Sequence, residues 1–220
     1  MAHSRASSGS RDKLFALATE HKQGKNMGAI FQSLGRTVTA GVVILLVMMG
    51  VAGTFSMMGA HGYWTFFMRY LHIASGVMWI GLLWYFNFVQ TPSMPKIPDE
   101  QKPAVSKVIA PTALFWFRWS ALATVVTGLL LAAMLGFIVQ ALTLQPGARA
   151  IGTGMWLALV MAFNVWFIIW PNQKKALGIV VVEAAEKAAA AKMAGMTSRI
   201  NTMLSIPMLY CMAAQSHGGF

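Results

Sequence analysis

The feature that most constrains this chain is a series of long apolar runs that carry almost no charge. A helix that crosses a bilayer needs about 20 consecutive, mostly apolar residues. Five segments approach or meet that length, and the last of them is the shortest and contains Pro207. They are residues 39–59, 66–89, 119–142, 151–170 and 200–216. The sequence therefore predicts an all-α integral membrane protein with a bundle of about five transmembrane helices.

The composition agrees with a membrane protein and argues against a nucleic-acid partner. Hydrophobic residues make up 57% of the 220 residues and charged residues only 10%, whereas typical soluble domains are about 25% charged. The net charge of +11 would favour nucleic-acid binding if basic side chains covered a folded, soluble surface. Here the basic residues lie between apolar runs, so we expect membrane lipid as the surroundings and no nucleic acid.

The basic residues also predict the orientation in the membrane. With five spans, all but two of the 17 basic residues lie on one side, in the N-terminal arm and in segments 90–118 and 171–199. The two exceptions are Arg69 and Arg149. Because Lys and Arg accumulate in cytoplasmic loops, we expect an inner-membrane protein with a cytoplasmic N-terminus and a periplasmic or external C-terminus. A four-span arrangement would give the same loop count, with the C-terminus inside.

Two polar segments accompany the predicted membrane domain, which covers residues 36–219. Residues 1–35 form a cytoplasmic arm that begins rich in Ser, Gly and Arg, a composition that predicts partial disorder. Residues 174–199 carry opposite charges four positions apart and a run of alanines, which favour a helix. We expect a cytoplasmic connecting helix there.

The positions of the acidic residues exclude several kinds of chemistry. All six lie outside the predicted spans, so the sequence provides no intramembrane carboxylate for a proton relay, a metal site or an acid/base pair. The single cysteine, Cys211, excludes a CxxCH haem-attachment motif and an internal disulfide. The acidic residues are Asp12, Glu20, Asp99, Glu100, Glu183 and Glu186.

Histidines are the candidate functional residues. His61, His72 and His217 are all predicted near the outer side of the membrane, on different segments. His72 lies about six residues inside its span, roughly 9 Å deep, and an ionisable group within a span is by default a functional hypothesis. Because two imidazoles from facing helices can ligate the iron of haem b, we expect His72 and His217 to be iron ligands.

The residues around His72 fit a haem-binding stripe. Arg69 lies one turn away on the same helix face, nearer the water, where a haem propionate would need a cation. Gly76 lies one turn deeper and leaves room for a flat macrocycle, and Trp79 follows on that face. The sequence therefore predicts a cofactor site made of Arg69, His72, Gly76 and Trp79, with His217.

Simpler interpretations stay open for each feature. His72 can form a hydrogen bond to a neighbouring helix, and His217 can be an interfacial residue in a loose tail. The sequence MMGAH, which ends at His61, is a minor indication of copper. A polar group near the cytoplasmic side could hold a polar substrate or a quinone head, but an interhelical hydrogen-bond network is the better interpretation; it consists of Asn87, Gln90, Arg118, Asn164 and Asn172. Small residues recur at every fourth position and indicate helix packing; they are Thr124, Gly128, Ala132 and Gly136.

Several stretches resemble the membrane domain of the cytochrome c-type urate oxidases, also called urate hydroxylases. These are LHIASGVMWIGLLWYFNFVQTP (71–92), FWFRWSALATVVTG (115–128), NVWFIIWPNQKK (164–175) and NTMLSIPMLYCMAAQSHGG (201–219). The resemblance extends over about residues 36–219. The WPNQKK corner and the ending with Pro-Met and a terminal His are its most specific motifs, whereas LHxxxGxxWxG also occurs in other small haem-binding membrane families.

The resemblance implies a helical membrane domain that passes electrons to a cytochrome c, with urate or a similar purine as substrate. Longer family members carry a c-type cytochrome domain after the membrane part. This chain has no CxxCH, so we expect a short form, an oxidoreductase that uses a separate cytochrome. The resemblance supports His72 and His217, whereas Trp79 and Asn164 match the family pattern without an assigned role.

Two other functions remain alternatives. The chain could be a non-catalytic accessory or structural subunit of a larger membrane respiratory or monooxygenase complex, which the lack of intramembrane carboxylates favours. A small transporter is least favoured, because the spans show no inverted repeats.

Overall fold

The computed structural model describes residues 30–217 and contains only helices and connecting turns in that part of the chain. The all-α prediction is therefore confirmed. The chain divides into two compact units, one up to Ala60 and one from His61. In the first unit, α2 (Leu34–Val51) is followed by the short 3₁₀ helix η1 (Thr54–Met57).

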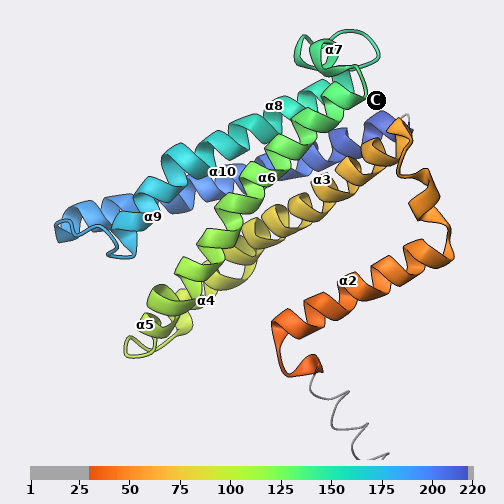
Figure 1. The fold of residues 1–220 in the computed structure, drawn as a ribbon. Helices are drawn as coiled ribbons and strands as arrows, with labels where there is room; N and C mark the ends of the chain where they lie inside the picture. The colour runs from red at the N-terminus through yellow and green to blue at the C-terminus, as the bar shows by residue number, and fades with distance from the viewer. Residues whose placement is uncertain (1–29, 218–220) are drawn as a thin grey trace, which may run out of the picture. The chain divides into compact units, whose positions relative to one another are not determined.

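The second unit consists of long helices, as Figure 1 shows, and several of them contain π-helical turns. Helix α3 continues through η2 and α4 into η3. The next long helix begins with α5 and continues through η4 into α6. Helix α8 continues through η5 into α9. Helix α7 is a single short segment, and α10 ends the described chain. The bounds are α3 His61–Trp84, η2 Tyr85–Gln90, α4 Thr91–Ser93, η3 Met94–Lys96, α5 Lys102–Ala104, η4 Val105–Ile109, α6 Ala110–Met134, α7 Ile138–Leu142, α8 Arg149–Phe163, η5 Asn164–Ile169, α9 Trp170–Ala176 and α10 Ala184–His217.

Within residues 30–217, four continuous helices are long and apolar enough to cross a membrane: Leu34–Val51, His61–Lys96, Lys102–Met134 and Arg149–Ala176. They correspond to the first four predicted spans. The predicted fifth span, residues 200–216, lies in α10, which is not among these four. The count of five spans stays a prediction.

Several helix bounds differ from the predicted segments. The first helix ends at Val51, because Gly53 takes a left-handed conformation with φ of 68°. The third ends at Met134, and Gly136 follows with φ of 77°, so this glycine terminates the helix and does not belong to its small-residue face.

The predicted connecting helix and the predicted fifth span form one uninterrupted helix. Helix α10 runs for 34 residues from Ala184 and continues through Pro207. Its first half contains many alanines, which have the highest helix propensity. The first residues of the predicted connecting segment instead belong to α9, which ends at Ala176 before Gly178 with φ of 75°.

The second unit is built from two helix pairs. Helix α3 packs mainly against α6, and α10 packs mainly against α8 and its continuation, whereas contacts between the pairs are fewer. The core between the pairs includes Trp79, Leu83, Phe117 and Met161, whose side chains are almost completely buried. Small residues allow the close approach within the second pair, since a Cβ on Gly154 would lie 3.1 Å from Cβ of Cys211.

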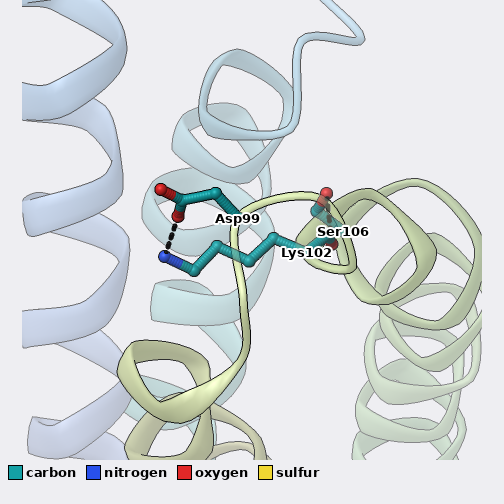
Figure 2. Close-up of polar contacts among 3 residues, drawn as sticks. All are labelled: Asp99, Lys102 and Ser106. Carbon is teal, nitrogen blue, oxygen red and sulfur yellow. Dashed lines mark hydrogen bonds and ion pairs between the residues drawn. The ribbon is translucent and has the colours of Figure 1, made fainter.

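The connection between the first pair of helices carries an exposed ion pair. Nζ of Lys102 lies 2.6 Å from Oδ1 of Asp99, and Oγ of Ser106 donates a 3.1 Å hydrogen bond to the Lys102 carbonyl, as Figure 2 shows. Lys102 lowers the pKa of Asp99 below its ordinary value. The hydrogen bond from Lys102 is the larger cause, and the positive charge of Lys102 is the second.

Candidate functional site

A cavity of about 690 Å³ lies among α3, α6, α8 and α10, where the two helix pairs meet. Its size is within the range of about 300–1,000 Å³ that small-molecule and cofactor sites occupy. Its walls are mainly apolar, with Arg69, His72, Thr124 and Gln215 among the few polar residues. The chain therefore forms a large apolar cavity whose described wall includes the imidazole of His72.

His72 is held against α6 by a main-chain hydrogen bond. Its Nδ1 lies 2.9 Å from the carbonyl oxygen of Thr124 and 3.4 Å from Oγ1 of Thr127. A carbonyl oxygen can only accept, so Nδ1 carries the hydrogen in this bond. Nε2 then keeps its lone pair, which is the arrangement that second-shell hydrogen bonds impose on metal-binding histidines.

Gly128 makes this position of the imidazole possible. A Cβ at Gly128 would lie 3.1 Å from Nδ1 of His72 and only 2.8 Å from Cε1, and the second distance is too short for the ring to stay in place. Together with Thr124 and Ala132, Gly128 lines the cavity. From the sequence, only a role in helix packing is predicted for these residues. The spacing of four gave the correct face of α6, but it did not show that His72 would lie on that face.

The predicted stripe on α3 is brought together in this cavity. Arg69, His72, Gly76 and Trp79 all line it. Trp79 is fully buried, and its Nε1 has no hydrogen-bond partner among the described residues. His217 is the last residue of α10, but its side chain lies outside the described part of the structure. Its predicted role as an iron ligand stays a prediction.

The α8 and α10 side of the cavity contains thioethers. Met155, Met208 and Met212 line the cavity from these helices. Thioether sulfur is a known axial ligand of haem iron. Gln215 supports this end of α10, because its Oε1 accepts a 3.2 Å hydrogen bond from the Ile151 main-chain N–H and its Nε2 donates one of 3.0 Å to the Gly147 carbonyl.

A haem would require fewer protein donors than a bare metal ion. Within residues 30–217, no group of three or more His, Cys, Asp or Glu side chains lies close enough to hold a metal ion. Haem iron is already held by four porphyrin nitrogens and needs only axial ligands from the protein. His61, the last residue of the MMGAH motif, has its Nε2 3.4 Å from the Met134 carbonyl oxygen.

The second polar group of the sequence analysis forms hydrogen bonds between helices. Nδ2 of Asn164 donates a 2.8 Å hydrogen bond to Oδ1 of Asn201, whose Nδ2 in turn donates one of 2.9 Å to the Met161 carbonyl. Nδ2 of Asn87 donates one of 2.8 Å to Oγ of Ser198. The network interpretation is confirmed for Asn87 and Asn164. Their α10 partners, Asn201 and Ser198, were missed, because the sequence does not show which polar residues of α10 face other helices.

Three members of that group behave differently. Asn172 bonds only within its own helix, to the Ile168 carbonyl at 2.8 Å. Oε1 of Gln90 and Nη1 of Arg118 are buried and have no hydrogen-bond partner among the described residues. The Arg118 guanidinium instead stacks on Trp170, with Cζ 3.6 Å from the ring centroid, a cation–π contact.

Residues 135–219 match the family model described as Urate oxidase N-terminal. No curated protein and no solved structure matches the chain. The C-terminal part of the chain is therefore similar to the N-terminal region of urate oxidases, and for residues 135–219 this confirms the resemblance found in the sequence. The matched residues include α8 and α10, which form one side of the cavity, whereas His72 on α3 lies outside them.

Proposed function

We propose that the chain is a membrane electron-transfer protein that binds haem b in the large cavity, with His72 as an axial ligand. The observation that carries this proposal is the orientation of His72, whose Nδ1–H is bound to the Thr124 carbonyl and whose Nε2 is left for a metal at the wall of a 690 Å³ apolar cavity. Haem bound there would supply one-electron chemistry.

The other cavity residues would hold the haem through an ion pair, a hydrogen bond and close packing. Arg69 would pair with a propionate, and Gly76 would leave room for the ring. The unpartnered Nε1 of Trp79 would donate to an acceptor on the ligand, which would remove the cost of a buried donor. The second axial ligand would come from α10, from His217 or from a lining methionine such as Met212.

The proposed partners are supported by the similarity of residues 135–219 to urate oxidases. The urate oxidase resemblance supports exchange of electrons with an external cytochrome c, with urate or a similar purine as the ultimate substrate. The charge distribution of the sequence supports a cytoplasmic N-terminus and a cavity whose His72 end faces the outer side of an inner membrane.

The test is the dithionite-reduced minus oxidised absorption spectrum of the protein purified in detergent after haem-replete expression. We expect a b-type α-band that is lost in His72→Ala and retained in His61→Ala. His61 is a matched control because it lies on the same helix and its ring also contacts a main-chain carbonyl of α6. His72→Asn, which keeps a side-chain donor near the Thr124 carbonyl, separates loss of the ligand from loss of the fold.

The remaining outcomes decide between alternatives. A shifted band in His217→Ala or in Met212→Leu would identify the second axial ligand. Absence of any band in the wild-type protein would overturn the haem proposal. The chain would then be better explained as a non-catalytic accessory subunit, and co-purification of partner chains would be the next measurement.

A further inference from the structure

A second, smaller cavity lies where all three π-helical turns of residues 30–217 meet. It measures about 120 Å³ and is lined by residues of η2, η4 and η5, together with residues of α6, α9 and α10. Single π-helical turns are rare and often occur at functional sites, because they redirect side chains and backbone groups from the regular helix. Straight helices could pack together without any π-helical turn, so three of them around one cavity point to a role for this cavity.

The polar groups at this cavity are neutral and include an unpartnered acceptor. Oε1 of Gln90 is buried without a hydrogen-bond partner among the described residues. Oγ of Ser198 accepts the 2.8 Å hydrogen bond from Asn87, so its own hydrogen remains available. No charged residue lines the cavity. A ligand here would therefore be uncharged and would both donate and accept hydrogen bonds.

The remaining wall suits a flat ring. Phe86 and Phe117 lie edge to face with centroids 5.7 Å apart, and both line the cavity beside Leu114. A volume of about 120 Å³ corresponds to roughly four water molecules at about 30 Å³ each and is smaller than sites for drug-sized ligands. It accommodates one ring with its oxygens, while Thr91, an exposed lining residue, marks where a longer substituent would leave.

From these observations we infer that the small cavity binds the head group of a membrane quinone. The amide of Gln90 and the hydroxyl of Ser198 can each donate or accept, so the same side chains would serve the carbonyls of a quinone and the hydroxyls of a quinol. A neutral, lipophilic molecule also agrees with helices that are apolar enough to cross a membrane. This site is separate from the His72 cavity, with which it shares no lining residue.

The experiment uses a photoreactive azido-quinone with a short alkyl tail on the full-length protein in detergent. After illumination, labelled peptides are identified by mass spectrometry, with and without excess decylubiquinone. We expect label in residues 86–117 or 169–198, which include all the lining residues, and we expect the competitor to suppress it. Gln90→Leu should weaken decylubiquinone binding about three- to tenfold, as expected for the loss of one hydrogen bond. Gln140→Leu, at an exposed glutamine of α7, is the matched control.

Label outside these residues, label that decylubiquinone does not suppress, or unchanged affinity in Gln90→Leu would each overturn the inference. The cavity would then be a site for ordered water. If Gln90→Leu does not fold, the labelling map of the wild-type protein decides alone. None of these measurements depends on bound haem, so they succeed or fail independently of the haem proposal.

Discussion

At the scale of single residues, Gly128 determines where the His72 ring can lie. Gly128→Ala would place a Cβ 2.8 Å from Cε1 of His72, so the ring must move and its hydrogen bond to Thr124 weakens. We expect a destabilisation of about 1–3 kcal/mol, typical of overpacking, measured as a lower thermal unfolding midpoint. Gly81→Ala is the control, because this glycine also lines the cavity but has nothing within 4 Å of an added Cβ. Equal midpoints for the two variants would contradict the prediction.

A second residue-scale prediction concerns the pKa of Asp99. Lys102 lowers this pKa, so the ionised carboxylate is the form favoured in the folded protein. The ion pair therefore contributes its stabilisation above the ordinary pKa of Asp, and loses it as the pH falls through the lowered value. The sequence has one other aspartate, Asp12, so a carbon-13 NMR titration of Asp-labelled protein can resolve both.

Lys102→Met is the variant that isolates the cause. It removes the ammonium group and keeps the aliphatic part of the side chain, so the pKa of Asp99 should rise to its ordinary value. An Asp99 titration that is the same in both proteins would show that the 2.6 Å contact between Lys102 and Asp99 does not persist in solution.

At the scale of helices, Asn201 joins α10 to α8 and η5. It is fully buried and bonds both Asn164 and the Met161 carbonyl. Asn201→Leu would remove both hydrogen bonds and leave the half-buried Asn164 amide without its partner on α10, and we expect a destabilisation of about 1–3 kcal/mol. Asn172→Leu, which removes only a bond within one helix, should cost less. Thermal unfolding in detergent tests this, and the prediction fails if the two variants have the same midpoint.

The helices also show what sequence could and could not predict. Apolar runs located four helices correctly, because lipid-compatible length is a property of the segment itself. The residues of one face, such as Arg69, His72 and Gly76, were grouped correctly because helical periodicity is local. The sequence did not predict that two of the expected segments form the single helix α10, or that His72 contacts Gly128. Both features depend on tertiary packing, and no pattern of neighbouring residues indicates them.

At the scale of the whole molecule, the predicted topology can be tested with single cysteines. A Cys211→Ser background removes the one native thiol. Exposed positions in three connections are then replaced one at a time, as Glu100→Cys, Gln145→Cys and Glu183→Cys. With a membrane-impermeant thiol reagent on spheroplasts, we expect labelling only at position 145, because the other two connections carry most of the nearby basic residues. Labelling at 100 and 183 but not at 145 would reverse the orientation.

Helix α10 passes both cavities, since Ser198 lines the small one and Met212 the large one. These residues are 14 positions apart in one unbroken helix, which at 1.5 Å per residue is about 21 Å along its axis. The length of this helix therefore fixes the distance between the two cavities. Inserting one residue between them would turn one end against the other by about 100°, so length and register in this segment are constrained even where no side chain touches a ligand.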